Sequence, residues 1–154
     1  MWPELQEEVE LELAMIREHL GMFAPLLDAV RGRAPDAIET AALGAMLHSF
    51  YNGVENIFKR IAIHCDGGPP RGEGSHAELL DRMTRPGANR PIAVSGSLAA
   101  ELHGYLRFRH KFRYAYSVQL RWTDMTDLVA GCSGVLDRLE AEMTAFLKVM
   151  SERQ

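Results

Sequence analysis

The sequence predicts an all-α fold, an antiparallel four-to-five-helix bundle. Apolar residues recur at steps of three and four through most of the 154 residues, and no alternation typical of strands competes with this period. Breaks that contain glycine and proline separate the periodic segments at ordinary connection lengths, as in bundles of amphipathic helices. With 47% hydrophobic and 25% charged residues, the composition is that of an ordinary domain, so we expect one helical domain over residues 1–154.

The first helix is predicted by an apolar stripe that runs from Val9 to Val30. Glutamates crowd the beginning of this helix, where the helix dipole favours negative charge. Pro25 lies inside the stripe and removes one backbone donor. We therefore expect a kink near residues 21–25, helped by Gly21.

The second helix is predicted by an apolar pattern from Leu43 to Ile61, after a turn at residues 32–36. It should end near Cys65, because the Asp-Gly-Gly-Pro-Pro segment that follows cannot continue a helix. Its apolar arc is wide, which favours a central position. One row of this helix is polar and is expected to line a cleft or, as we favour, to form a buried polar layer. The residues of this row are His48, Tyr51, Asn52 and Glu55.

Two helices are expected after the loop that follows Cys65. A short helix should run from Ser75 to about Thr84, with the Ser75 side chain as its cap. After a second loop, Ser95 or Ser97 is expected to cap a longer helix that carries apolar residues over 98–112.

The last helix is predicted from Asp124 to Met150, and Cys132 lies on its apolar stripe. The other cysteine, Cys65, stands far away in the sequence, and neither has the spacing of a zinc ribbon or a disulfide framework. Both cysteines are expected to behave as small buried hydrophobes.

Composition also excludes several functions. The net charge of −4 and the pI of about 5.9 argue against generic coating of DNA. No apolar run is long enough to cross a membrane and the first residues lack a signal-peptide profile, so we expect no membrane contact and a cytoplasmic protein. His64, Asp66 and His76 match no standard zinc pattern. We expect no metal and no cofactor.

The segment 105–116 contains four basic residues and no acid, which predicts an anionic partner. On a helix, Arg109, Arg113 and Tyr116 fall on one face at steps of four and three. Guanidinium groups donate paired hydrogen bonds to phosphate, and the aromatic residues between them can stack on bases. The residues expected to contact RNA phosphates are Arg107, Lys111 and Arg113. The alternative is a solvated basic stripe whose arginines pair with acids of the first or last helix.

The sequence Phe-Arg-His-Lys-Phe-Arg-Tyr-Ala-Tyr at residues 108–116 resembles the final signature of the HEPN superfamily, and specifically that of HepT-like proteins. In that superfamily an arginine, a polar residue, a few further residues and a histidine form the motif, and HepT toxins add a tyrosine two positions later. Arg109 matches the arginine, His110 the polar position and Tyr116 the tyrosine. The resemblance spans most of residues 40–120 and includes residues 47–58, 66–70 and 76–80.

The resemblance implies a toxin that acts as a metal-independent endoribonuclease and forms a homodimer, with Arg109 of each copy lining one RNA cleft. It also implies a partner, a minimal nucleotidyltransferase antitoxin that adenylylates the toxin tyrosine, here Tyr116. Such a site works because a histidine takes the proton of an RNA 2′-hydroxyl while an arginine holds the charged phosphorane.

The chain departs from the motif at one position, because Tyr114 stands where the catalytic histidine is expected. A tyrosine with an ordinary pKa near 10 is a poor base at neutral pH, so we expect cleavage to be lost or severely weakened unless another residue acts. His110 is the candidate substitute beside Arg109. On an ideal helix, however, residue 110 lies about 100° from residue 109, whereas residue 114 lies about 140° away in the other sense.

Two further hypotheses stay open at this point. The first is a catalytically degenerate HEPN-like module that binds RNA, nucleotide or a nucleotidyltransferase partner without cutting, as Tyr114 suggests. The second is a helical structural protein whose basic stripe is only a surface.

Overall fold

The computed structural model describes residues 2–114 and 120–153, and within them it contains helices and loops but no strand beyond an isolated bridge between Gly87 and Arg90. The all-α prediction is therefore confirmed for the described residues. The helices in chain order are α1 (Trp2–Met22), α2 (Ala24–Gly32), α3 (Ala37–Cys65), α4 (Ser75–Met83), α5 (Gly96–Tyr114) and α6 (Trp122–Glu152).

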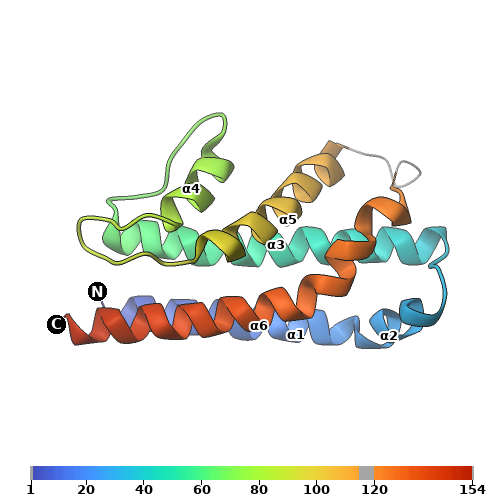
Figure 1. Cartoon of the computed structure of the whole chain (residues 1–154), viewed down its shortest axis with the longest axis horizontal. Coiled ribbons are helices and arrows are strands. Elements are labelled where there is room, and N and C mark those ends of the chain that lie inside the picture. The colour runs from blue at the N-terminus through green and yellow to red at the C-terminus, as the bar shows by residue number, and fades with distance from the viewer. Residues whose placement is uncertain (1, 115–119, 154) are drawn as a thin grey trace.

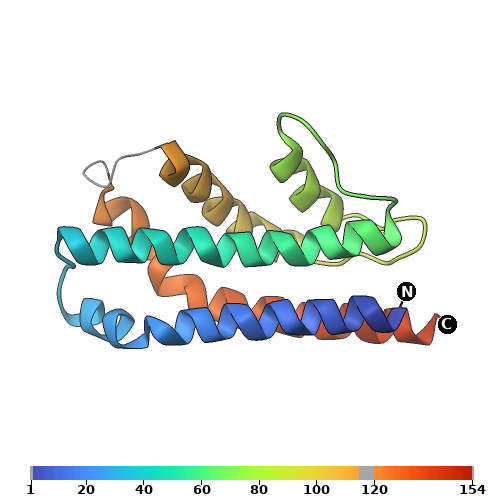
Figure 2. The ribbon, with the colours of Figure 1, turned by 180° about the vertical axis from the view of Figure 1, so that it is seen from behind.

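The long helix α3 lies in the middle of the bundle (Figure 1). On one side of it run α1, α2 and most of α6, and on the other side lie α4 and α5 (Figure 2). The helix α6 begins near the end of α5, crosses α3 and then runs antiparallel to α1, so that both chain termini lie at the same end. Because α3 contacts α1, α4, α5 and α6, its wide apolar arc is buried on several sides, as predicted.

The predicted kink in the first helix is present as a complete break. The helix α1 ends at Met22, Phe23 stands between the helices, and α2 begins at Ala24. Pro25 lies in the first turn of α2, where the backbone N–H that proline lacks would have no partner within the helix in any case. The proline therefore starts a new helix instead of bending the old one.

The helix α3 begins with a reciprocal cap. The Asp36 carboxylate accepts a hydrogen bond from the backbone N–H of Glu39 at 2.8 Å, and the Glu39 carboxylate accepts one from the backbone N–H of Asp36 at 3.0 Å. Arg33 donates two further hydrogen bonds to the Glu39 carboxylate, and together these contacts lower the pKa of Glu39 to about 2. The turn before α3 is thus fixed by side chains.

The caps of α4 and α5 differ from each other. The prediction that Ser75 caps α4 is wrong: the cap residue is Gly74, whose φ of 73° lies in the left-handed region that glycine adopts without strain. Ser75 is instead the first residue of the helix. For α5 the prediction is confirmed, because the Ser95 hydroxyl accepts a hydrogen bond from the backbone N–H of Leu98 at 3.1 Å. The helix α6 begins at Trp122, two residues before the predicted start at Asp124.

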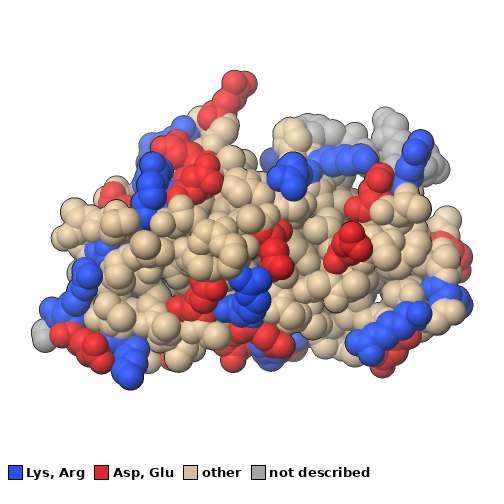
Figure 3. All heavy atoms as spheres, viewed as in Figure 1, with Lys and Arg blue, Asp and Glu red and all other residues tan. Residues whose placement is uncertain are grey.

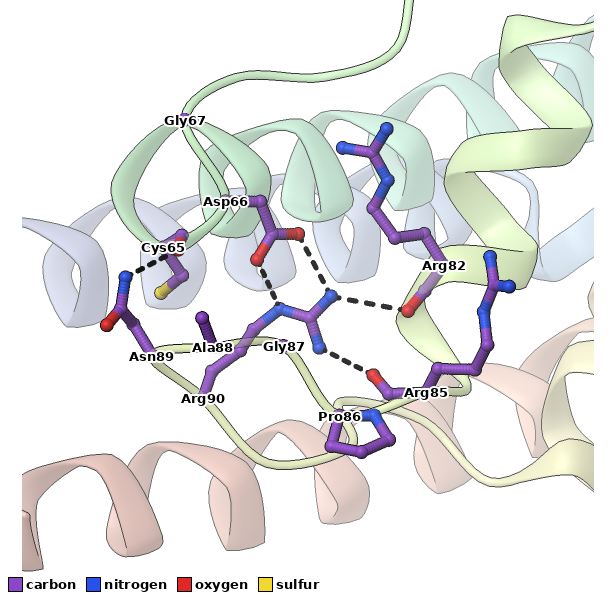
Figure 4. Close-up of a pocket in the computed structure, with 10 residues that line it drawn as sticks. All are labelled: Cys65, Asp66, Gly67, Arg82, Arg85, Pro86, Gly87, Ala88, Asn89 and Arg90. Atoms are coloured by element: carbon purple, nitrogen blue, oxygen red, sulfur yellow. Dashed lines mark hydrogen bonds and ion pairs between the residues drawn. The ribbon is translucent and has the colours of Figure 1, made fainter.

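A buried ion pair joins the loops on either side of α4 (Figure 4). The Arg90 side chain is 1% exposed and donates two hydrogen bonds to the Asp66 carboxylate, each at 2.9 Å. It also donates to the backbone carbonyls of Arg82, Arg85 and Pro91. This arginine therefore fixes the end of α3 and both loops around α4 in one network.

Both cysteines are free and buried, as predicted. Burial raises the pKa of each thiol, and it raises the pKa of Cys132 to about 12. No helix among the described residues combines the length and the apolar character needed to cross a membrane.

The helices α1 and α3 pack closely at Gly53. A Cβ atom added to this glycine would lie 2.5 Å from Cγ1 of Ile16. We expect Gly53→Ala to lower the free energy of unfolding by about 1–3 kcal/mol, because the core must shift to admit the methyl group. In contrast, Gly134→Ala in α6 meets no atom within 4 Å and should raise that free energy by about 0.5–1 kcal/mol. Urea unfolding followed by circular dichroism measures both, and equal effects would contradict the close packing.

Candidate functional site

The site is built around Arg109, which α5 places in the interior with a side chain only 3% exposed. Its Nη2 donates to Oε2 of Glu55 at 2.9 Å, and its Nη1 donates to Oδ1 of Asn52 at 2.8 Å. The guanidinium carbon also lies 4.9 Å from the ring centroid of Tyr51. Residues of α3 thus hold the guanidinium from two sides, and its orientation is fixed before any ligand binds.

Glu55 is the acid at the centre of this network and is itself buried. Besides Arg109, its carboxylate contacts Nδ1 of His76 at 2.8 Å and Nζ of Lys59 at 3.4 Å. Burial alone would raise the pKa of Glu55, but hydrogen bonds from Arg109 and His76 outweigh it and leave the pKa below its ordinary value. Glu55 is therefore a carboxylate at neutral pH, held by the cationic Arg109 and Lys59 and by the imidazole of His76.

His76 comes to this network from the first turn of α4. Its Nδ1 lies 2.8 and 3.0 Å from the two Glu55 oxygens and 3.1 Å from Nη2 of Arg109. Its side chain is 44% exposed, so one part of the imidazole touches the buried carboxylate while another part faces outward. The site therefore combines side chains from α3, α4 and α5.

A pocket of about 760 Å³ opens beside these residues, between α5 and the segment that begins α4. Basic side chains and imidazoles predominate among its lining residues, and Glu73 is the acid among them. Lys and Arg side chains follow the outer half of α5 beside the hollow that separates it from α4 (Figure 3). The basic and imidazole residues of the lining are His76, His103, Arg107, Arg109, His110 and Arg113.

The structure brings most of the sequence-predicted site residues to this pocket. Arg107, His110 and Arg113 line it together with Arg109, so the helical offset of about 100° does not keep His110 out of the pocket. Lys111 lies elsewhere, with Nζ 3.3 Å from Oδ2 of Asp124 in α6. Lys111 therefore agrees with the alternative prediction, in which basic residues of this segment are exposed and pair with acids of the last helix.

Two predicted residues lie at the edge of what the structure describes. Tyr114 is the last residue of α5, and its side chain lies outside the described part. Tyr116, the expected adenylylation site, lies within residues 115–119, which are also outside the described residues.

The polar row of α3 follows the favoured prediction of a buried polar layer. Tyr51 and Glu55 are buried, and Asn52 and Glu55 accept hydrogen bonds from Arg109, which lines the pocket. The His48 ring packs against Phe112 at 5.3 Å between centroids, and burial together with the nearby arginines lowers the pKa of His48. The buried polar layer therefore supports Arg109, while its own residues are not among those that line the pocket.

Sequence reasoning missed the role of His76 and treated it only beside His64 and Asp66 as a possible metal ligand. These three residues have different partners, because His64 contacts Glu8, Asp66 binds Arg90, and His76 contacts Glu55. Within the described residues no group of three or more His, Cys, Asp or Glu side chains is placed to hold a metal ion. A signal that could have found the site is Glu55, an acid on the most apolar helix, which needs cationic partners when buried.

Comparison with known proteins identifies the family. A family model described as HepT-like protein matches residues 42–150, which include the site residues from α3, α4 and α5. No curated protein and no solved structure matches the chain. Because the match covers more than half of the chain and agrees with the helical bundle, the chain belongs to the HepT-like protein family.

Proposed function

We propose that this chain binds RNA in the pocket between α4 and α5 and cuts it as a metal-independent endoribonuclease. The observation that carries the proposal is the pocket lining, in which three arginines and three histidines surround a space of about 760 Å³. The buried Arg109 has a fixed orientation, while the exposed Arg107 and Arg113 can reach neighbouring phosphates. An RNA backbone, with one negative charge per nucleotide, is a ligand that suits this lining.

Membership of the HepT-like family extends the proposal to partners. We propose that the chain acts in the cytoplasm as a toxin, that it forms a homodimer in which two pockets share one RNA cleft, and that a minimal nucleotidyltransferase antitoxin neutralises it. Tyr116 is the proposed site of adenylylation, because it occupies the position of the toxin tyrosine in the resemblance.

A second candidate function is binding of RNA without cleavage. The observation that favours it is Tyr114 at the position of the motif histidine, since a tyrosine holds its proton at neutral pH. In this case the chain would bind RNA, nucleotide or the nucleotidyltransferase without cutting RNA.

Binding and cleavage of a fluorescent single-stranded RNA in EDTA test the proposal. The double variant Arg107→Ala/Arg113→Ala should bind at least tenfold more weakly, and the slope of log Kd against log salt should fall by roughly 0.7 for each phosphate that no longer has a cationic partner. Arg138→Ala, which removes an exposed arginine of α6 outside the pocket, is the matched control and should bind like the native chain.

Three outcomes separate the candidates. Cutting by the native chain in EDTA supports the endoribonuclease. Binding without cutting, with cleavage restored by Tyr114→His, supports the second candidate and overturns the first. Equal binding by the native chain and the double variant overturns both.

A further inference from the structure

The proton on His76 is fixed by its neighbours. A carboxylate only accepts hydrogen bonds, so the distance of 2.8 Å between Nδ1 of His76 and Oε2 of Glu55 requires a proton on Nδ1. Nη2 of Arg109 lies 3.1 Å from the same nitrogen, but it already donates to Oε2 of Glu55 at 2.9 Å. Glu55 thus accepts from both groups, and the neutral imidazole carries its lone pair on Nε2.

The other nitrogen of this ring is available to a ligand. His76 lines the pocket with a side chain that is 44% exposed, and within the described residues no hydrogen bond engages Nε2. Glu55 holds one edge of the ring, and among the described residues no hydrogen bond holds the other edge. This is the arrangement of a histidine that a carboxylate orients for proton transfer.

We propose that His76, oriented by Glu55, is the general base of this chain and takes the role that Tyr114 cannot perform. The proposal rests on the proposed endoribonuclease function and adds a catalytic residue from outside the family motif. His76 and Arg109 contact the same carboxylate, so a proton acceptor and a guanidinium lie side by side at the pocket. A phosphodiester in the pocket would meet both groups at once.

The reaction balances without a metal or a redox partner. Nε2 of His76 takes the proton of the RNA 2′-hydroxyl, and the 2′-oxygen attacks the adjacent phosphorus. The new 2′-oxygen to phosphorus bond forms as the bond from phosphorus to the 5′-oxygen breaks, and water protonates the leaving 5′-oxygen. The products are a 2′,3′-cyclic phosphate and a 5′-hydroxyl, and Glu55 stabilises the imidazolium that forms.

Charged groups from every neighbouring element act on His76. The acids near His76 are Glu55 on α3, which also pairs with Lys59, and Glu73 before α4. The basic and imidazole groups of α5 that line the same pocket are Arg107, Arg109, Arg113, His103 and His110. A general base works only in its unprotonated form, so a cleavage rate that depends on an imidazole should fall on the acid side.

The test compares His76→Ala with His64→Ala under single-turnover conditions in EDTA. His64 is the matched control, since it also pairs with a glutamate, Glu8, but lies outside the pocket. We expect His76→Ala to lose about 10²–10⁴-fold in cleavage rate and to lack the acid limb of the pH profile. Added imidazole should restore part of the rate, which a merely structural role of His76 would not allow. His64→Ala should cut within threefold of the native rate.

RNA binding is measured separately with an oligonucleotide that carries 2′-deoxyribose and cannot be cut. Its Kd should stay within threefold in His76→Ala. The proposal is overturned if His76→Ala cleaves RNA at the native rate. It is also overturned if the cleavage rate falls only because RNA binding is lost, or if added imidazole does not restore part of the rate. If the native chain binds this oligonucleotide but cuts no RNA, the role of His76 as general base is overturned while the proposal of RNA binding stands. If the native chain does not bind it, the proposed function itself is overturned.

Discussion

Replacing Arg90 by methionine is expected to lower the free energy of unfolding by about 3–5 kcal/mol, because the change leaves Asp66 as a buried charge without its partner. The Asp66 side chain is only 8% exposed, and both of its carboxylate oxygens accept hydrogen bonds from Arg90. The backbone carbonyls of Arg82, Arg85 and Pro91 are deprived of a donor by the same substitution. Urea unfolding at pH 7 followed by circular dichroism gives the difference.

Arg17→Met is the matched control for this prediction. Arg17 also binds carboxylates, those of Asp137 and Glu140, but its side chain is 49% exposed and water can take its place beside both acids. Its removal should cost about 1 kcal/mol or less. If Arg90→Met proves no more costly than Arg17→Met, the Asp66–Arg90 network does not hold α4 in place.

Replacing Arg109 by methionine is expected to have a similar effect at pH 7, about 3–5 kcal/mol, but one that depends on pH. In the native chain the pKa of Glu55 lies below its ordinary value of 4.5, so Glu55 adds stability above pH 4.5 that is lost as the pH falls through the lowered pKa. Without Arg109, burial becomes the dominant influence and should raise the pKa of Glu55 above 4.5. The difference between native chain and variant should therefore shrink as the pH falls from 7 towards 4.5.

The check is the free energy of unfolding of both chains at several pH values in this range. Arg138→Met serves as control, because its ion pair with Glu101 is exposed and should contribute little at any pH. If the difference in free energy of unfolding between the native chain and Arg109→Met stays constant from pH 7 to 4.5, the loss of stability does not come from the buried charge of Glu55.

Local patterns were enough to predict the helices. The apolar period, the proline at 25 and the break after Cys65 are properties of neighbouring residues, and each is found in the structure close to its predicted position. The cap of α4 could not be found in this way, because the left-handed backbone of Gly74 competes with a serine that is also a good cap residue. Apolar periodicity carries no information about which of two adjacent cap residues is used.

Only part of the site was predictable, because its residues are far apart in the sequence. Arg109 was found from its motif, but its partners lie 54 and 33 positions earlier in the sequence, at Glu55 and His76. Which of the acids and histidines would meet Arg109 depends on how α3, α4 and α5 pack. Lys111 is an example of a residue that the sequence placed wrongly at the site. It belongs to the same basic segment as Arg109, but its side chain is exposed and pairs with Asp124 of α6.

The two buried thiols make the protein a convenient host for a single chemical probe. Thiol-reactive dyes attack thiolates that solvent can reach, and Cys65 and Cys132 offer neither exposure nor easy ionisation at neutral pH. A cysteine introduced at the exposed Ser133 of α6 would therefore take up a dye or spin label while both native cysteines remain in place. Energy transfer between copies labelled in this way would report directly whether two chains associate, and at what separation, in the presence of RNA.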